Sequence, residues 1–185
     1  MTADRARQAG FTDSVLARLV QRGRIERTSR GVYRIPYLTP GRFSQYREAV
    51  HWAKASRGPE LVAISHATAL AAFEISDANP NSIHITIPKT ARLRRQKPKA
   101  IVVHREDLGP QDITVHEGIP LTTISKTVAD LLKVGERIDL VRQAISNARR
   151  EGFTGDSEAK QLQRRGQEHL KTVHAPQSRM EPAIP

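Results

Sequence analysis

Arginine side chains crowd the start of this 185-residue chain. The first 47 residues hold ten arginines, no lysine and three acids, Asp4, Asp13 and Glu26, so this stretch carries a net charge of +7 out of +11 for the whole chain. A planar guanidinium can grip a phosphate or the edge of a guanine with two hydrogen bonds, whereas an ammonium acts as a point charge. Charge concentrated in this way predicts binding to a polyanion, and we expect that polyanion to be DNA.

Composition narrows the class of partner and the setting. Eight aromatic residues are few for stacking single-stranded bases, which favours double-stranded DNA. The chain has no cysteine, which excludes disulfides, zinc sites with thiolate ligands and thiol nucleophiles. The sequence shows neither a leader peptide nor an apolar stretch of about 20 residues, so we expect a cytoplasmic protein with no membrane partner.

Two short helices are expected to carry the first arginines. Thr2 can cap a helix that ends at Gly10, and Thr12 can cap a second helix that ends at Gly23. The second helix has one apolar stripe at helical spacing: Val15, Leu16, Leu19 and Val20. Burial of that stripe turns the polar and basic side of the second helix outward.

The outward side of the second helix suits recognition of DNA, because its first residues are short and its later ones can reach phosphates or bases. Two alternating runs follow at 24–27 and 32–35, joined by Ser29-Arg30-Gly31 as in a hairpin. Helix, turn, helix and basic hairpin predict a winged helix-turn-helix over 1–38; the alternative is a plain packing unit. The expected DNA contacts are Thr12, Asp13, Ser14, Ala17, Arg18, Gln21 and Arg22 on the helix and Arg27, Arg30 and Arg34 on the hairpin.

Two features depart from the usual winged-helix pattern. Winged helices have a helix before the one that starts at Thr2, so this domain either lacks its first helix or has a true start upstream of Met1. A trimmed domain is expected to expose the apolar faces of its two remaining helices. The acid at Asp13 can accept a hydrogen bond from cytosine, or it can favour the helix N-terminus while repelling phosphate.

A boundary is expected at Pro36, Pro40 and Gly41, followed by a unit of mixed α and β structure over 43–152. A polar helix and a disordered tail are expected over 153–185. The patterns predict helices at 44–56, 66–73, 125–132 and 138–150, strands at 61–64, 82–87 and 100–104, and a further strand and turn over 113–120. The whole chain is therefore predicted to be an α+β protein.

A second run of basic residues lies inside the second unit. The segment 89–99 has six basic residues in eleven and no acid. It is either a solvated loop or a second contact surface for DNA, RNA or an acidic protein. Its basic residues are Lys89, Arg92, Arg94, Arg95, Lys97 and Lys99.

Residues suited to catalysis are sparse. The second unit holds four histidines that are isolated in the sequence: His66, His84, His104 and His116. They lack the spacing of metal ligands, so we expect structural or surface roles. Glu158-Ala-Lys160 is the one Glu-x-Lys of the chain, and a polar helix is a poor place for the buried metal site of a nuclease. We expect no catalytic residue, no metal, no cofactor and no enzyme activity.

Four blocks of sequence together resemble a known family. They are residues 2–34, then Ser65-His66-Ala67-Thr68-Ala69-Leu70, then Ile83-His-Ile-Thr-Ile-Pro88, and finally Gly118-Ile-Pro-Leu-Thr122 with Lys126-Thr127-Val-Ala-Asp130-Leu. Their order and spacing, over about 2–151, resemble the AbiEi-like antitoxins of type IV abortive-infection toxin–antitoxin systems. Taken alone, Ser65 reads as a helix cap, and Lys126 with Asp130 as an i,i+4 ion pair.

The resemblance implies an antitoxin that also regulates transcription. Its winged helix would bind inverted repeats in its own promoter and repress the operon. Its second domain would counter a nucleotidyltransferase-like toxin without a stable complex, as part of phage defence. The residues leave two other classes open: a winged-helix regulator unrelated to any toxin, whose second domain senses a ligand or dimerises, and a magnesium-dependent nuclease that uses Glu158.

Overall fold

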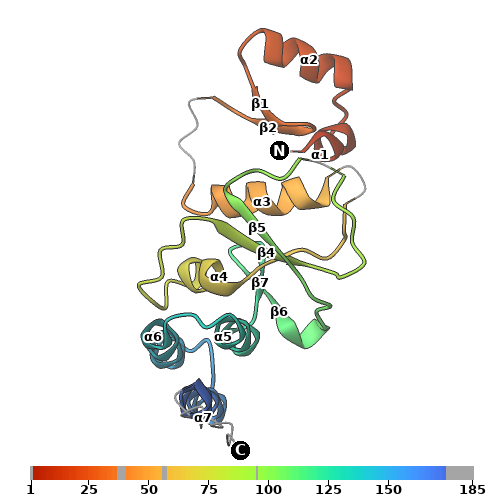
Figure 1. The fold of residues 1–185 in the computed structure, drawn as a ribbon. Helices are drawn as coiled ribbons and strands as arrows, with labels where there is room; N and C mark the ends of the chain where they lie inside the picture. The colour runs from red at the N-terminus through yellow and green to blue at the C-terminus, as the bar shows by residue number, and fades with distance from the viewer. Residues whose placement is uncertain (1, 37–40, 56–57, 95, 174–185) are drawn as a thin grey trace, which may run out of the picture.

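The computed structural model describes residues 2–36, 41–55, 58–94 and 96–173. It is an α+β structure, as the sequence predicts, with its elements stacked in layers along one direction (Figure 1). The helices are α1 (Ala3–Gln8), α2 (Asp13–Gln21), α3 (Ser44–Lys54), α4 (His66–Phe73), α5 (Ile124–Lys133), α6 (Ile138–Arg150) and α7 (Asp156–Val173). The strands are β1 (Glu26–Ser29), β2 (Val32–Arg34), β3 (Ala63–Ile64), β4 (Ile83–Ile87), β5 (Ile101–Arg105), β6 (Ile113–His116) and β7 (Ile119–Thr122), and a 3-10 turn, η1 (Pro110–Asp112), precedes β6.

The two predicted helix caps of the N-terminal segment are confirmed. The Thr2 hydroxyl accepts a hydrogen bond from the Arg5 amide at 3.2 Å, and the Thr12 hydroxyl accepts one from the Val15 amide at 3.4 Å. Gly10 lies between the two helices with a φ of +85°, a conformation that side chains disfavour. Local capping and one glycine therefore set the turn from α1 to α2.

The apolar faces of α1 and α2 are covered, so the expected exposure of these faces is wrong. Ala3, Ala6, Leu16 and Ile25 form a small buried core, against which Leu19, Val20 and Tyr33 pack. The chain before α1 lies along the hairpin, where the Ala3 amide donates to the Gly31 carbonyl at 2.8 Å. The hairpin thus folds back over the two helices and supplies the cover.

The predicted hairpin is present, with its first strand two residues later than expected. β1 and β2 pair antiparallel with Glu26 opposite Arg34, and a bulge lies between Arg27 and Ser29. Arg24 belongs instead to the turn after α2, because its amide donates to the Leu19 carbonyl at 2.9 Å.

The second sheet has five strands in the order β5-β4-β3-β7-β6. β3 pairs with β7 and β4 with β5 in parallel, whereas the pairs β3–β4 and β6–β7 are antiparallel. The strand and turn predicted over 113–120 are in fact a hairpin of two strands joined at Glu117-Gly118. The second strand was not predicted because it contains Pro120, and proline weakens a strand prediction.

Helices cover both faces of this sheet (Figure 1). α3 packs on one face, α4 and α5 lie on the other, and α6 and α7 form the outer layer. The predicted helix at 153–185 is confirmed over Asp156–Val173, and its Ala159 and Leu162 are buried in the same core as the sheet. The rest of the predicted tail, 174–185, lies outside the described residues. Within the described ranges no helix has the length and hydrophobicity to cross a bilayer.

Candidate nucleic-acid interface

The outward side of α2 is exposed at every position where DNA contact is expected. Leu16 is fully buried beneath it, so the helix is held by one side and free on the other. The exposed residues are Thr12, Asp13, Ser14, Ala17, Arg18, Gln21 and Arg22. The Thr12 hydroxyl caps the helix and lies 2.9 Å from the Ser14 hydroxyl, so these two groups hold the first turn as well as facing solvent.

A hollow of about 590 Å³ lies between α1, α2 and the hairpin. Asp13 and Ala17 line it from α2, and Arg27 and Arg30 line it from the hairpin. The fold therefore brings the first turns of the expected recognition helix and the basic hairpin to one concave surface. Arginines outnumber acids in its lining, since Arg7, Arg27 and Arg30 stand against Asp4 and Asp13, and guanidinium groups are suited to phosphate contacts.

Asp13 is paired with a basic residue of its own unit. Arg7 lies 2.6 Å from Asp4 and 3.9 Å from Asp13, measured between guanidinium nitrogen and carboxylate oxygen. Asp13 is also in the first turn of α2, where a negative charge is favourable. Asp13 therefore lies at the helix start and forms an ion pair with Arg7.

Arg34 is separated from the other hairpin arginines. Its Nη2 donates to Glu26 Oε2 at 2.6 Å across the two strands, and this hydrogen bond raises the pKa of Arg34. Glu48 on α3 adds a smaller effect of the same sign. Val32, two residues earlier on the same side of the strand, lines a hollow with Trp52 of α3. Arg34 therefore faces the side of the hairpin toward α3, while Arg27 and Arg30 face the hollow beside α2.

The second basic segment forms the connection between β4 and β5. Its described basic residues are exposed: Lys89, Arg92, Arg94, Lys97 and Lys99. Arg95 lies outside the described residues. Lys97 Nζ donates to the Ile101 carbonyl at 2.7 Å, which ties the end of the segment to β5. Pro98 and Ala100 share a hollow with Thr28 of the hairpin, so the segment ends beside the N-terminal unit.

Ser65 does not cap α4 through its side chain, which corrects the sequence prediction. Its hydroxyl instead accepts a hydrogen bond from Thr86 Oγ1 at 2.8 Å and lies 3.0 Å from His66 Nδ1. Ser65 and Thr86 are both buried. The hydroxyl is thus committed to joining the start of α4 to β4 rather than to a helix amide.

The predicted pair of Lys126 and Asp130 on α5 is confirmed, and it is part of a larger network. Lys126 and Lys133 each place an amino nitrogen 3.0 Å from the Glu106 carboxylate. Asp130 is 1% exposed, and its Oδ2 has no hydrogen-bond partner among the residues that the structure describes. Burial raises the pKa of Asp130, against the opposing effect of Lys126.

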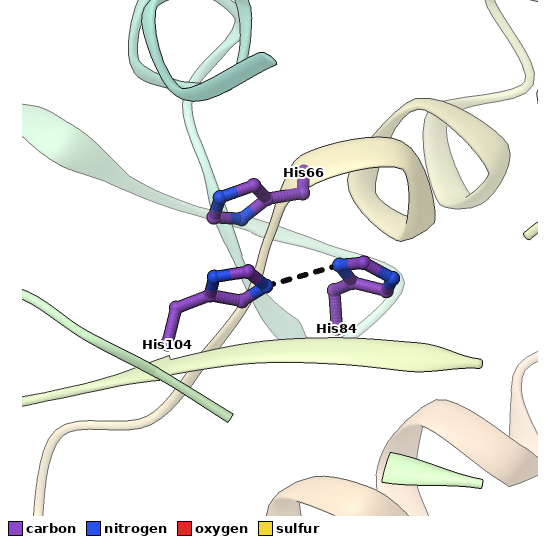
Figure 2. A group of neighbouring side chains, drawn as sticks. All are labelled: His66, His84 and His104. Atoms are coloured by element: carbon purple, nitrogen blue, oxygen red, sulfur yellow. Dashed lines mark hydrogen bonds between the residues drawn. The ribbon is translucent and has the colours of Figure 1, made fainter. Parts of the chain in front are cut away.

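Three of the four histidines that are isolated in the sequence are neighbours in space. His66 starts α4, His84 lies in β4 and His104 in β5, and Figure 2 shows their rings facing one another. His84 Nδ1 is 3.0 Å from His104 Nε2, and the rings of His66 and His104 stack with centroids 3.6 Å apart. Burial lowers the pKa of His66 to about 3 and that of His104 to about 4.

Sequence spacing had no means of finding this cluster, because its members come from three elements whose pairing is long-range. In β4 the polar residues His84 and Thr86 alternate with isoleucines, and this alternation is the local sign that one side of the strand is polar. His116 lies elsewhere and packs against Phe43, Phe73 and Phe153.

Glu158, the residue considered for a nuclease, is occupied by hydrogen bonds. One of its oxygens accepts from Ser125 of α5, and the other accepts from Thr154 at 2.7 Å. These bonds lower the pKa of Glu158, because they stabilise its charged form. The carboxylate therefore fastens the start of α7 to α5.

The fold and the exposed arginines define an α+β protein with a helix-helix-hairpin unit at its N-terminus and a larger sheet domain behind it. Residues 2–36, which are this unit, match the family described as "Transcriptional regulator, AbiEi antitoxin". The resemblance noted from the sequence is therefore confirmed over that segment, and the matched family is one of regulators rather than enzymes.

Comparison with solved structures extends the fold likeness beyond the N-terminal unit. The chain is similar to the crystal structure of the RV2827C protein from Mycobacterium tuberculosis, with a TM-score of 0.54 and 14% sequence identity. The similarity covers 95% of this chain and 72% of that one, so the two proteins share both units of the fold. No curated protein matches the sequence.

Proposed function

We propose that this protein is a DNA-binding transcriptional regulator and the antitoxin of a type IV toxin–antitoxin system. The observation that carries the proposal is the exposed side of α2 beside Arg27 and Arg30, within the segment that matches the AbiEi family. In this proposal α1 and α2 with the β1–β2 hairpin act as a winged helix-turn-helix. Residues 1–38 are the DNA-binding domain, 43–152 the antitoxin domain and 153–185 its C-terminal extension.

The dimensions of α2 suit the major groove. An α-helix with its side chains is about 10–12 Å across, which fits the width of about 12 Å of that groove in B-DNA. Arg18 and Arg22 lie one turn apart on the exposed side, where one can read a base while the other contacts a phosphate. Arg27 and Arg30 then contact the flanking backbone, and the basic segment 89–99 adds a second contact beside the hairpin.

The expected target is an inverted repeat in the promoter of the protein's own operon. Footprinting on the DNA upstream of the reading frame tests this directly: protection of two equivalent half-sites supports the proposal, and no protection at any site contradicts it. The antitoxin role is tested by co-expression with the neighbouring gene. Rescue of growth from a nucleotidyltransferase-like toxin is expected, without a stable complex in size-exclusion chromatography.

A regulator with a ligand-sensing second domain is the other candidate. A hollow of about 270 Å³ next to His84 favours it, since Asn79, Ser82 and Glu136 give the hollow polar walls. This volume is just below the range of about 300–1,000 Å³ usual for small-molecule sites. Promoter binding that changes with a small metabolite and a neighbouring gene unrelated to toxins would favour this candidate over the antitoxin.

A further inference from the structure

Three histidines meet on the side of the sheet that faces α4 (Figure 2). His66 is the first residue of α4, and His84 and His104 belong to the adjacent parallel strands β4 and β5. Each side chain offers one ring nitrogen, and these three nitrogens lie within 4.8 Å of one another. His66 is only 5% exposed, and His84 and His104 are partly buried.

Backbone pairing holds the cluster together. His84 and Thr86 are two residues apart on β4 and so point to the same side, and Thr86 is the register partner of His104. The two strand histidines therefore share one face of the sheet. The hydrogen bond from Thr86 to Ser65 fixes the start of α4 over that face and brings His66 to it.

A neutral imidazole ring carries a proton on one nitrogen and offers the lone pair of the other nitrogen to a metal ion. The Ser65 hydroxyl lies 3.0 Å from His66 Nδ1 and can accept a hydrogen bond from an N–H at that nitrogen. The lone pair of Nε2 is then available to a metal ion, as it is when an outer partner holds a metal-bound histidine.

One of the nitrogen–nitrogen distances is close to that around a bound ion. His84 Nδ1 and His104 Nε2 are 3.0 Å apart, whereas two nitrogens at about 2.05 Å from a tetrahedral zinc are about 3.3 Å apart. The His66 and His104 rings are nearly parallel, at 16°, and parallel rings do not direct their lone pairs to one point. Coordination therefore requires the His66 ring to turn out of its stacked position.

His66 also has an unusual backbone. Its φ is +54°, a left-handed conformation that is uncommon for residues other than glycine and is often found at functional sites. The same backbone brings the His66 side chain over the two strand histidines. His66 is thus both a member of the histidine cluster and a residue with a strained backbone.

We propose that His66, His84 and His104 bind one divalent transition-metal ion of the zinc class. Neutral imidazoles suit zinc, copper, nickel and cobalt, and are poor ligands for magnesium and calcium. Three histidine ligands leave the fourth position of a tetrahedral ion open. The hollow lined by Ala67, Ser82, His84 and Glu136 gives that position a route to solvent for a water molecule or a small anion.

The site is separate from the proposed DNA interface. The cluster lies on the α4 side of the sheet, whereas the N-terminal unit lies beyond α3 on the other side (Figure 1). The metal proposal therefore stands or falls independently of DNA binding.

Titration with Co²⁺, followed by competition with Zn²⁺, tests the proposal on the full chain prepared without a histidine tag. We expect one ion per chain and absorption bands of tetrahedral cobalt that disappear as zinc replaces it. His84→Gln and His104→Gln should each weaken zinc binding at least 100-fold. His116→Gln is the matched control, since this residue belongs to the same unit but lies outside the cluster, and it should bind zinc as the wild type does.

Two results would overturn the proposal. One is wild-type zinc affinity no higher than that of His104→Gln, and the other is loss of binding in His116→Gln. Circular dichroism establishes whether each variant is folded. If a strand variant does not fold, His66→Gln replaces it: zinc should raise the melting temperature of the wild type and leave that of His66→Gln unchanged, and an equal rise in both would contradict the site.

Discussion

Arg34 and Glu26 face each other across the N-terminal hairpin, with Arg34 Nη2 2.6 Å from Glu26 Oε2. Both side chains are about half exposed, so the pair contributes little to stability. Its larger effect is on charge. Glu26 neutralises an arginine on the side of the hairpin that faces α3, and it adds a negative charge close to the basic surface formed by Arg27 and Arg30.

Glu26→Gln should strengthen binding to duplex DNA. The substitution removes a negative charge that repels phosphate, while Arg34 stays on the side of the hairpin toward α3. We expect a modest affinity gain at low salt that shrinks as salt screens the charge, and no added phosphate contact. Fluorescence anisotropy over a salt series measures both, and Glu60→Gln is the control for loss of an exposed acid elsewhere. Equal gains in the two variants would show that only total charge matters.

Glu158→Gln should lower stability at neutral pH and have little effect in acid. Hydrogen bonds from Ser125 and Thr154 lower the folded-state pKa of Glu158 below its ordinary value of 4.5. The stability that Glu158 contributes is therefore present above that value and is lost as the pH falls through the lowered folded pKa.

Urea denaturation from pH 7 to pH 3 measures this difference. At pH 7 the variant should lose about 1–3 kcal/mol of unfolding free energy, the usual worth of hydrogen bonds to a charged group. The gap from the wild type should narrow as the pH falls below 4.5. A gap that stays constant with pH would mean that the charge of Glu158 plays no part in fastening α7.

Lys126→Met should destabilise the protein more than any exposed lysine variant. It leaves Asp130, which is 1% exposed, as a buried charge without its closest partner, at a cost of about 3–5 kcal/mol. Lys133→Met is the matched control, because that side chain is 63% exposed and is expected to cost less than about 1 kcal/mol. Adding Asp130→Leu to Lys126→Met should restore stability. If the double variant is as unstable as Lys126→Met alone, the loss of stability does not come from the unpaired carboxylate of Asp130.

Local signals in the sequence predicted much of this fold. Thr2 and Thr12 lie directly at the starts of their helices, and Gly31 at the hairpin turn, so each element could be read from a few neighbouring residues. The exposed side of α2 followed from its apolar stripe, since burying one side of a helix exposes the other.

Long-range pairing was not accessible in the same way. His84 and His104 come together because β4 and β5 pair in parallel, and the sequence of neither strand indicates which strand it pairs with. Ser65 looked like a helix cap because its position fits one, yet Thr86, 21 residues away, takes its hydroxyl. In the sequence Arg34 and Arg30 are both hairpin arginines, and only the packing of the hairpin on α3 shows that they face different sides. In each case the deciding contact lies in another element.

The central claim, that α2 and the hairpin form the DNA interface, is tested most directly by two variants of equal charge. One carries Arg18→Ala, Arg22→Ala and Arg30→Ala; the other carries three exposed arginines changed on α6 and α7, Arg142→Ala, Arg164→Ala and Arg165→Ala. Their affinities for duplex DNA from upstream of the reading frame are compared at several salt concentrations.

The first variant should bind at least 100-fold more weakly than the wild type, with a salt dependence lower by about two to three units, because each lost phosphate contact removes close to one. The second should stay within about threefold of the wild type, as expected for exposed charges more than a Debye length from the DNA. Equal losses in both variants, or wild-type binding by the first, would contradict this interface.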